Sequence, residues 1–354
     1  MKDKNRLSFL IIFALIAAIL SGCGNLSAGT ADTPQAEKYS YTFDAFDTAI
    51  TVTAYCDSQE SFDEFLSICM TEYSRYHQLY DIYNIYPGLN NIKSINDYAG
   101  EKEIAVDPDI IELLSFGKEV FHFTDGRVNI AMGSVLRFWH DIREYNSNFP
   151  NDMCLPDAEA MEKAAKHCNI DDVVIDAEAG TVWIRDPELR IDVGALAKGY
   201  ATERIAETLQ EKGFTTFALN AGGNVRTGNE KPDGSAWKIG ITDPMHPMSG
   251  EYVGIADAIN SSVVTSGSYQ RYFTYEGKNY HHIIDPDTLQ PENRFLSVTV
   301  ETENSDYSDA MSTALFNMDL NQGLNLVENT DHLEAMWILP DGTISTSSNF
   351  VYSD

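Results

Sequence analysis

The sequence predicts a single α+β domain that follows a short N-terminal targeting segment. Strands and helices are interspersed along the chain without the regular βαβ alternation of a parallel sheet. Hydrophobic residues make up 43% of the 354 residues, which is enough for a large packed core. No stretch within 40–354 has the composition of an interdomain linker. We therefore expect residues 40–354 to form one α+β unit.

The N-terminus has the pattern of a bacterial lipoprotein signal. A basic start, residues 2–6, precedes an apolar run of 12 residues from Phe9 to Leu20. A bilayer core needs roughly 20 apolar residues, so this run is too short to be assigned as a spanning helix. It leads into Leu20-Ser21-Gly22-Cys23, which resembles the lipobox at which lipoprotein precursors are cleaved and lipidated.

This pattern predicts a signal peptide over 1–22, a lipid on the Cys23 thiol and a flexible tether over 23–39. The expected location is the cell envelope, with the chain anchored by its lipid to the outer face of the bacterial cytoplasmic membrane. The alternative is a buried N-terminal helix that ends at Gly22.

The charge of the chain excludes a nucleic-acid partner. Asp and Glu number 54 against 24 Lys and Arg, which gives a formal net charge of −30. Binding to a phosphate backbone needs a clustered basic surface. Any anionic small molecule that this chain binds must therefore meet a local excess of positive charge.

Composition predicts the strands. Residues 39–56 are rich in Thr, Tyr, Phe and Val, which favour extended segments. The short apolar runs 173–175 and 181–184 flank Glu178-Ala179-Gly180 and predict a hairpin. Further strands are expected at 215–219, 237–242, 252–257, 262–265, 271–275, 279–284 and 296–302.

Apolar periodicity predicts the helices. Asp107-Pro108 is a typical helix entry and precedes a helix expected over 107–122. The clearest helix runs from Ala195 to Lys212, and Gly213 follows its end. Its apolar face carries Ala197, Ala201, Ile205 and Leu209. Other helices are expected at 60–79, 157–167 and 308–318, and a last helix–strand pair closes the chain.

Two short segments could bind an anion. In residues 191–201 (IDVGALAKGYA), Lys198 lies in the first turn of the predicted helix, where free N–H groups and the helix dipole favour a phosphate. The same spacing fits Asp192 as a helix cap beside an exposed lysine. The turn 220–224 (NAGGN) either lets its backbone approach a ligand closely or simply reverses the chain.

Two further groups carry chemistry. His281 and His282 are adjacent in a predicted strand, so their side chains point to opposite faces and at most one enters a given site. Such a histidine is either a general base or a hydrogen-bonded structural residue. Asp306, Asp309 and Thr313 offer hard oxygen ligands suited to magnesium or calcium. The alternative is that the two carboxylates only stabilise the start of their helix.

Taken in order, these segments closely resemble the ApbE family of FAD:protein FMN transferases. The strings that carry the resemblance are 191–201, 220–224, 237–244 (WKIGITDP), 265–273 (TSGSYQRYF), 282–288 and 308–314 (SDAMSTA). The resemblance covers about residues 42–340. It implies one α+β unit related to the T-fold, with two lobes around the FAD site.

The resemblance also implies the site residues. Magnesium would be held by the backbone carbonyl of Ala195 and by the side chains of Asp306, Asp309 and Thr313. His282 is the implied general base, and Lys198 stabilises charge on the phosphates. Arg271 and Gly222-Gly223 are implied phosphate neighbours. The implied FAD contacts are Phe46, Tyr83, Ala131, Met132, Gly133, Asp192 and Lys198.

Four departures from the family pattern affect the implied FAD contacts, and one of them is Leu289, which replaces the Gly that is common after DPxT. Phe46-Asp47-Thr48 stands where the family often has Met-Gly-Thr, and Asn129 aligns where an Asp is usual. Ala131-Met132-Gly133 stands where the family has a Thr-Val-Gly stretch.

The implied reaction is Mg²⁺-dependent transfer of FMN from FAD to a Ser or Thr hydroxyl of an acceptor protein, with release of AMP. The acceptor is expected to be a membrane-bound or exported electron-transfer protein that carries a Ser/Thr flavinylation motif. Two alternatives remain: a Mg²⁺-dependent FAD pyrophosphatase, which releases FMN and AMP, and a non-catalytic flavin-binding lipoprotein.

Overall fold

An eight-stranded antiparallel sheet is the framework of the fold. In the computed structural model, which describes residues 36–353, the strand order is β1-β2-β6-β7-β10-β13-β14-β15, and every neighbouring pair is antiparallel. The strands are β1 (Glu37–Ala45), β2 (Thr48–Cys56), β6 (Phe217–Ala221), β7 (Asn224–Thr227), β10 (Ser262–Gly267), β13 (Ser297–Thr302), β14 (Glu334–Ile338) and β15 (Ile344–Thr346).

Smaller antiparallel sheets surround this framework. One combines β16 (Tyr352–Ser353), β9 (Tyr252–Ala258) and β8 (Trp237–Thr242). A second combines β3 (Ile104–Ala105), β5 (Thr181–Ile184) and β4 (Val173–Asp176), and β11 (Tyr272–Tyr275) pairs with β12 (Lys278–His281).

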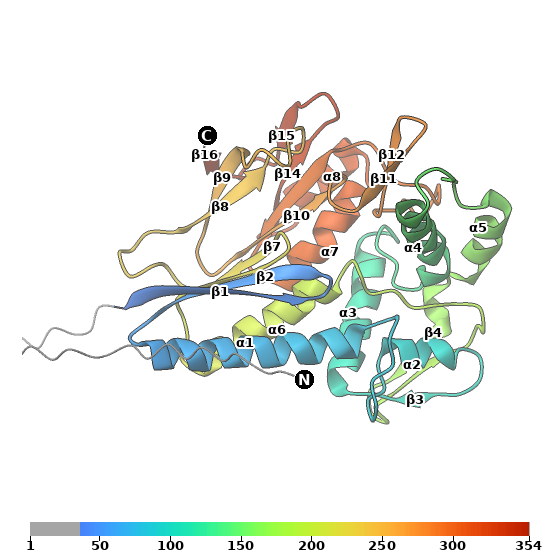
Figure 1. Cartoon of the computed structure of the whole chain (residues 1–354), viewed down its shortest axis with the longest axis horizontal. Helices are drawn as coiled ribbons and strands as arrows, with labels where there is room; N and C mark the ends of the chain where they lie inside the picture. Colours follow the sequence, from blue (N-terminus) through green and yellow to red (C-terminus); the bar gives the residue numbers. More distant parts are fainter. Residues whose placement is uncertain (1–35, 354) are drawn as a thin grey trace, which may run out of the picture. The chain divides into compact units, whose positions relative to one another are not determined.

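Three helices pack against the large sheet and against one another. They are α1 (Gln59–Tyr80), α6 (Ala197–Glu211) and α7 (Ser305–Phe316). Figure 1 shows α1 and α6 side by side along the sheet, with α7 at the far end of α6. The remaining helices are α2 (Ile92–Asp97), α3 (Pro108–Phe123), α4 (Gly133–Asn148), α5 (Ala158–Ala164) and α8 (Leu320–Glu328), with short 3₁₀ turns at Ala165–His167 and Ile170–Asp172.

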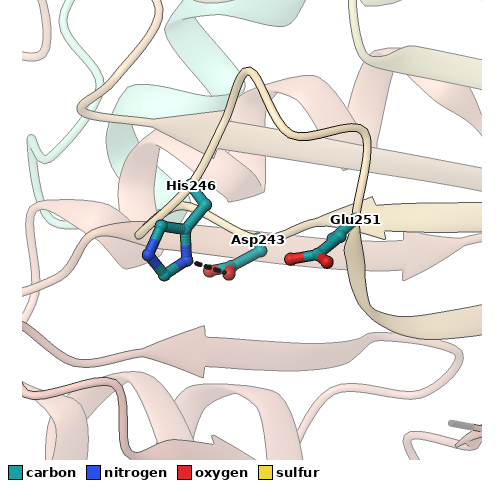
Figure 2. Close-up of side chains that lie close together, drawn as sticks. All are labelled: Asp243, His246 and Glu251. Atoms are coloured by element: carbon teal, nitrogen blue, oxygen red, sulfur yellow. Dashed lines mark hydrogen bonds and ion pairs between the residues drawn. The ribbon is translucent and has the colours of Figure 1, made fainter.

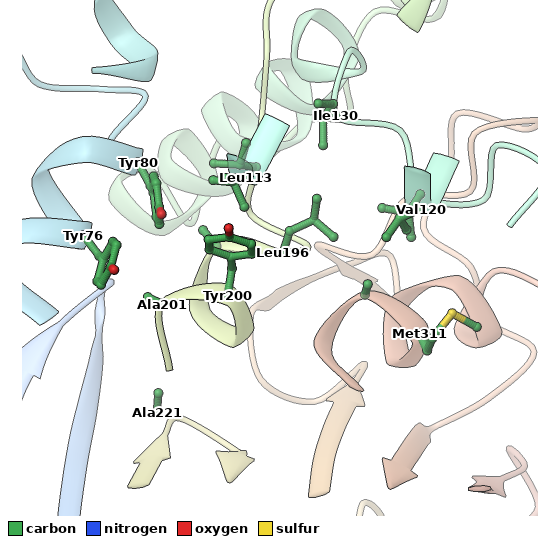
Figure 3. Close-up of a cluster of buried hydrophobic side chains, with 14 of the residues drawn as sticks. Tyr76, Tyr80, Leu113, Val120, Ile130, Leu196, Tyr200, Ala201, Ala221 and Met311 are labelled. Carbon is green, nitrogen blue, oxygen red and sulfur yellow. The ribbon is translucent and has the colours of Figure 1, made fainter. Parts of the chain in front are cut away.

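The main hydrophobic core lies where these helices meet the sheet. Side chains of α1, α3, α6 and α7 converge in it, as Figure 3 shows for Tyr80, Leu113, Tyr200 and Met311. Leu113 and Met311 have no exposed surface. Burial of each such side chain stabilises the fold by about 1.5–3 kcal/mol, so this core fixes the position of the α6 and α7 starts. None of the helices in residues 36–353 combines the length and apolar character needed to cross a bilayer.

Most predicted elements are confirmed, but helix α4, the short helix α2 and the short strands β3, β7, β15 and β16 were not predicted. In α4, Val135, Trp139 and Ile142 have helical spacing. The tether was predicted to extend to residue 39, but β1 already begins at Glu37. The predicted signal peptide, Cys23 and most of the tether lie outside the described residues.

The turn between β1 and β2 holds two residues in a left-handed backbone conformation. Phe46 has φ 52° and Asp47 has φ 53°, which are angles that glycine tolerates and most side chains avoid. Gly222, in the turn between β6 and β7, lies against this segment. A Cβ at Gly222 would lie 2.3 Å from the Thr48 hydroxyl, so the two turns pack closely.

We predict that Asp47→Gly stabilises the protein. Glycine adopts φ 53° without the cost that a side chain imposes, and we expect the free energy of unfolding to rise by about 0.5–1 kcal/mol. Urea unfolding followed by circular dichroism measures the change. Asp44→Gly, near the end of extended β1, is the matched control and should destabilise. Equal destabilisation by both substitutions would contradict backbone strain at Asp47.

Candidate functional site

A large cavity is lined by strands and turns of the large sheet and by helical segments, including α4 and the start of α6. Its volume is about 1320 Å³, which is ample for a dinucleotide. The β1–β2 and β6–β7 turns and strand β10 line one side. The opposite side is formed by residues 127–132 and 192–198 and by α4. Segments that are far apart in the sequence thus line one cavity within a single compact unit.

The cavity is locally positive in a strongly negative chain. Six basic side chains line it, against three carboxylates, although the whole chain carries −30. The basic residues are Lys38, Arg127, Arg143, Lys198, Lys238 and Arg271, and the carboxylates are Asp47, Asp192 and Asp309. Lys198, Arg127 and Lys238 pair with carboxylates. The positive charge that remains, on Lys38, Arg143 and Arg271, favours an anionic ligand.

The start of α6 packs directly against α7 at Gly199. A Cβ at this position would lie 2.4 Å from both the Asp309 Cβ and the Ser305 carbonyl oxygen, so only glycine fits. The Gly199 N–H donates to Asp309 Oδ2 at 2.8 Å. Asp309 therefore accepts one of the free N–H groups at the α6 start, where the helix dipole favours a carboxylate.

Three oxygen donors meet the cavity around Lys198. The Lys198 ammonium lies 3.2 and 3.3 Å from the two carboxylate oxygens of buried Asp309. Thr313, one helical turn further along α7, lines the same cavity, as does Ala195 just before α6. A carboxylate, a hydroxyl and a backbone carbonyl are the donor types that magnesium takes, so the residues fit this ion.

The two adjacent histidines have different surroundings. His281 Nε2 donates to the Glu292 carbonyl at 2.5 Å, and its Nδ1 accepts from the Ile283 N–H. Both ring nitrogens are thus used within the fold. His282 lines the cavity, and its buried Nδ1 has no hydrogen-bond partner among residues 36–353. This confirms that only one of the pair enters the site.

Burial and positive charge keep His282 neutral. Burial is the largest cause that lowers the pKa of His282, to about 3, and the charges of His281, Arg271, Arg143 and Lys198 act in the same direction. A neutral imidazole with a free ring nitrogen can accept a proton from a hydroxyl group.

Backbone hydrogen bonds join the two segments that form the helical side of the cavity. The Asp192 N–H donates to the Ile130 carbonyl at 2.8 Å, and the Gly133 N–H donates to the Arg190 carbonyl at 2.9 Å. The Asp192 carboxylate accepts from the Gly194 N–H. Burial raises the pKa of this carboxyl. Asp192 is therefore held rigidly at the cavity wall.

Comparison with known proteins assigns this arrangement to a family. The sequence profile described as the ApbE family matches residues 46–337. The chain belongs to the ApbE family. A relative from Klebsiella pneumoniae (strain 342), named FAD:protein FMN transferase, is 28% identical over 269 residues, which are 76% of this chain and 81% of the relative. A protein of the same name from Treponema pallidum is 27% identical and is matched over 73% of this chain and 74% of its own length.

Solved ApbE structures share the fold. The crystal structure of the ApbE protein from Thermotoga maritima superposes with a TM-score of 0.77 at 26% identity and covers 88% of this chain and 97% of that one. The flavin transferase ApbE from Vibrio cholerae superposes with a TM-score of 0.74 at 22% identity and covers 89% of this chain and 100% of that one. The predicted family and α+β fold are thereby confirmed.

Four of the seven implied FAD contacts line the cavity of this ApbE-family chain: Tyr83, Met132, Asp192 and Lys198. The other three do not. The Phe46 ring packs edge-on against His77, and its neighbours Asp47 and Thr48 line the cavity instead. Ala131 is completely buried, and the backbone of Gly133 is packed against Arg190.

Asp306 also differs from the implied metal set. It lies one helical turn before Asp309 and is absent from the cavity lining. Its carboxylate faces Arg204 of α6, at 3.7 Å from the guanidinium nitrogen. Burial and the nearby Glu203 raise its pKa. Ala195, Asp309 and Thr313 therefore line one cavity, while Asp306 packs between α6 and α7.

Arg143 was missed because α4 was missed. Its guanidinium lines the cavity near Arg271, and no carboxylate pairs with it among the described residues. Burial and the neighbouring Arg271 lower the pKa of Arg143. The signal that could have found it is the helical spacing of Trp139 and Arg143 in the sequence.

We predict that Gly199→Ala separates α6 from α7. The new methyl group cannot coexist with the Asp309 Cβ and the Ser305 carbonyl oxygen, so we expect destabilisation of about 1–3 kcal/mol. Thermal unfolding measures this cost, and FAD titration tests whether the cavity is altered. Gly323→Ala in α8 is the control, since it meets only side-chain atoms 3.1–3.6 Å away. Wild-type FAD affinity in Gly199→Ala would show that this contact does not position the site.

Proposed function

We propose that this chain transfers FMN from FAD to a Ser or Thr hydroxyl of an acceptor protein. The observation that carries the proposal is that His282, Lys198 and Asp309 line one positively charged cavity. The names of the relatives from Klebsiella pneumoniae and Treponema pallidum support the same reaction. The acceptor oxygen forms a bond to the FMN phosphorus, and the bond to the AMP phosphate oxygen breaks.

The residues of the cavity divide the chemical work. His282, which lines the cavity, takes the proton of the acceptor hydroxyl on its imidazole, a role that contributes about 10²–10⁴-fold to rate in typical enzymes. Lys198, Arg143 and Arg271 offset the negative charge of the pyrophosphate and of the departing AMP. The FMN half remains joined to the acceptor through a phosphoester bond, and the proton balance closes when His282 releases its proton to water.

Magnesium is part of the proposal. Ala195, Asp309 and Thr313 would hold it, through a carbonyl, a carboxylate and a hydroxyl oxygen. When bound, the ion supplies Lewis-acid stabilisation of charge on phosphate oxygens. The hydrogen bond from Gly199 N–H and the ammonium of Lys198 orient the Asp309 carboxylate for this role.

The cellular setting is also a proposal and rests on the sequence. The lipobox at Cys23 supports a lipid anchor on the outer face of the bacterial cytoplasmic membrane. The acceptor would then be a membrane-bound or exported electron-transfer protein within reach of the tethered domain.

A mass measurement tests the transfer. The purified chain is incubated with FAD, Mg²⁺ and an acceptor that carries a Ser/Thr flavinylation motif. We expect the acceptor to gain the mass of FMN, and EDTA to prevent the gain. Free FMN and AMP with an unmodified acceptor would establish a pyrophosphatase instead. Binding of FAD without formation of any product would indicate a non-catalytic flavin-binding protein.

Two aspartates on one helix give a matched comparison. Asp309→Asn keeps an oxygen for the Gly199 N–H but removes the charge, and we expect at least about a 100-fold loss of transfer. Asp306→Asn, outside the cavity, should leave the rate within a few fold of wild type. A similar loss of transfer activity in both variants would indicate that Asp306 is also a magnesium ligand.

The pH dependence reports on His282. Its pKa of about 3 leaves the imidazole neutral in the free protein, so kcat/KM should show no His282-dependent loss between about pH 5 and 7. Bound FAD offsets Arg143, Arg271 and Lys198, which lower this pKa, so the pKa rises in the complex. The acid limb in kcat therefore moves to higher pH. The His282→Gln variant should not show this acid limb in kcat. If wild-type kcat/KM instead falls with an apparent pKa near 6.5, and His282→Gln abolishes that fall, the neutral state of His282 in the free protein would be contradicted.

A further inference from the structure

The loop between β8 and β9 carries three potential metal ligands that the FMN-transfer site does not use. Asp243, His246 and Glu251 each offer a ligand atom, and these atoms all lie within 4.8 Å of one another. Figure 2 shows the imidazole of His246 directed at the carboxylate of Asp243, with the Glu251 carboxylate on the other side of it. Asp243 is the last but one residue of the WKIGITDP segment, and it is neither one of the proposed magnesium ligands nor the proposed general base, His282.

The backbone of the loop is arranged to keep the three side chains together. The Asp243 N–H donates to the Glu251 carbonyl at 3.1 Å and closes the base of the loop. His246 Nδ1 lies 2.9 Å from Asp243 Oδ2. The Ser249 hydroxyl donates to the His246 carbonyl and accepts from the Glu251 N–H, which links the two remaining ligand residues. These contacts fix the positions of all three Cα atoms before any ion is bound.

The geometry points to a site for a divalent transition-metal ion of the zinc type, and we propose that Asp243, His246 and Glu251 bind it. One imidazole nitrogen with two carboxylates is a donor set that zinc accepts, whereas magnesium prefers oxygen alone. Zinc–ligand bonds of about 2.0–2.2 Å place ligand atoms about 3.4 Å apart. The ligand atoms here lie within 4.8 Å of one another. To reach that value, the His246–Asp243 contact of 2.9 Å must open slightly, and the exposed Glu251 side chain is free to rotate.

Three protein ligands leave coordination positions open to water or to a fourth group. His246 has 69% of its side chain exposed, whereas the Asp243 side chain has 18%. The site therefore exchanges its ion with solvent, and we expect micromolar binding rather than a permanent structural metal.

The loop also forms part of the cavity mouth. Pro247 and Met248, between the ligand residues, line the FAD cavity, and Met248 has 96% of its surface exposed. An ion that joins His246 to Asp243 and Glu251 restrains both of these residues. We infer that zinc stiffens this wall of the cavity, where an acceptor protein would approach.

Metal titration tests the site independently of flavin transfer. The purified protein is titrated with Zn²⁺ by calorimetry, and with Co²⁺ while its visible absorption is followed, both in millimolar Mg²⁺. We expect one micromolar site that magnesium does not displace. His246→Ala and Glu251→Gln, both at exposed positions, should weaken the binding at least about tenfold.

Two variants serve as controls. His332→Ala removes an exposed histidine that lies near Glu303, and Asp309→Asn changes the cavity carboxylate. Both should bind Zn²⁺ as wild type does. Loss of binding in Asp309→Asn alone would place the ion in the cavity and overturn the proposal. If the wild-type protein binds no Zn²⁺ at submillimolar concentrations, the proposal is also overturned. Asp243 would then only stabilise the loop through its hydrogen bonds.

Hydrogen exchange of residues 244–250 provides a readout of the restraint. Zn²⁺ should slow exchange there in wild type and leave it unchanged in His246→Ala. Unchanged exchange in wild type that binds zinc would contradict the proposed stiffening of the cavity wall.

Discussion

The contact between Gly199 and Asp309 is the constraint on which the site depends. It joins the starts of two helices that are 110 residues apart in the chain, and it does so through a backbone N–H and a buried carboxylate. Because no side chain fits at Gly199, α6 and α7 approach until Asp309 reaches the free N–H groups of α6. Lys198, in the same helical turn, contacts both oxygens of that carboxylate. The large core beneath the two helices holds this approach in place.

The cavity is lined by an excess of basic side chains, although the chain as a whole is strongly negative. This local positive charge allows the cavity to bind an anion. A net charge of −30 repels a pyrophosphate at long range, but screening limits that repulsion to about 10 Å at moderate salt. Within the cavity, Arg143 lacks a carboxylate partner among the described residues and is partly removed from water. An unpaired buried charge is costly, and an anionic ligand relieves that cost. Burial, together with the charges of Arg143, Arg271 and Lys198, lowers the pKa of His282 and keeps its imidazole neutral.

The walls of the cavity differ in rigidity. The helical side is fixed by backbone hydrogen bonds between residues 130–133 and 190–192, and Asn96 binds both backbone groups of Ile191. The β1–β2 turn is a two-residue hairpin loop whose left-handed angles the paired strands impose, and Gly222 packs against it at Thr48. The β8–β9 loop is tied at its base and is exposed at Met248. A rigid wall suits FAD, which needs a fixed position, whereas an adaptable rim suits a protein acceptor.

The amino-acid sequence was sufficient to predict the fold class, the family and most strands and helices. It also indicated Lys198, Asp309, Thr313 and His282 as candidate site residues, and all four line the cavity. Apolar periodicity and short segments with fixed spacing are local properties, so they can be read from one chain. Helix α4 was not predicted because few of its residues are buried, and Arg143 was therefore not predicted as a site residue.

Tertiary structure decided what the pattern of residues left open. Asp306 and Asp309 are equally good ligands by spacing, but packing turns one toward Arg204 and the other toward Gly199 and Lys198. Phe46, Ala131 and Gly133 match family positions, yet their side chains or backbone are used in packing while neighbouring residues reach the cavity. Which side of a residue faces a cavity depends on contacts with distant segments, and sequence spacing does not contain that information.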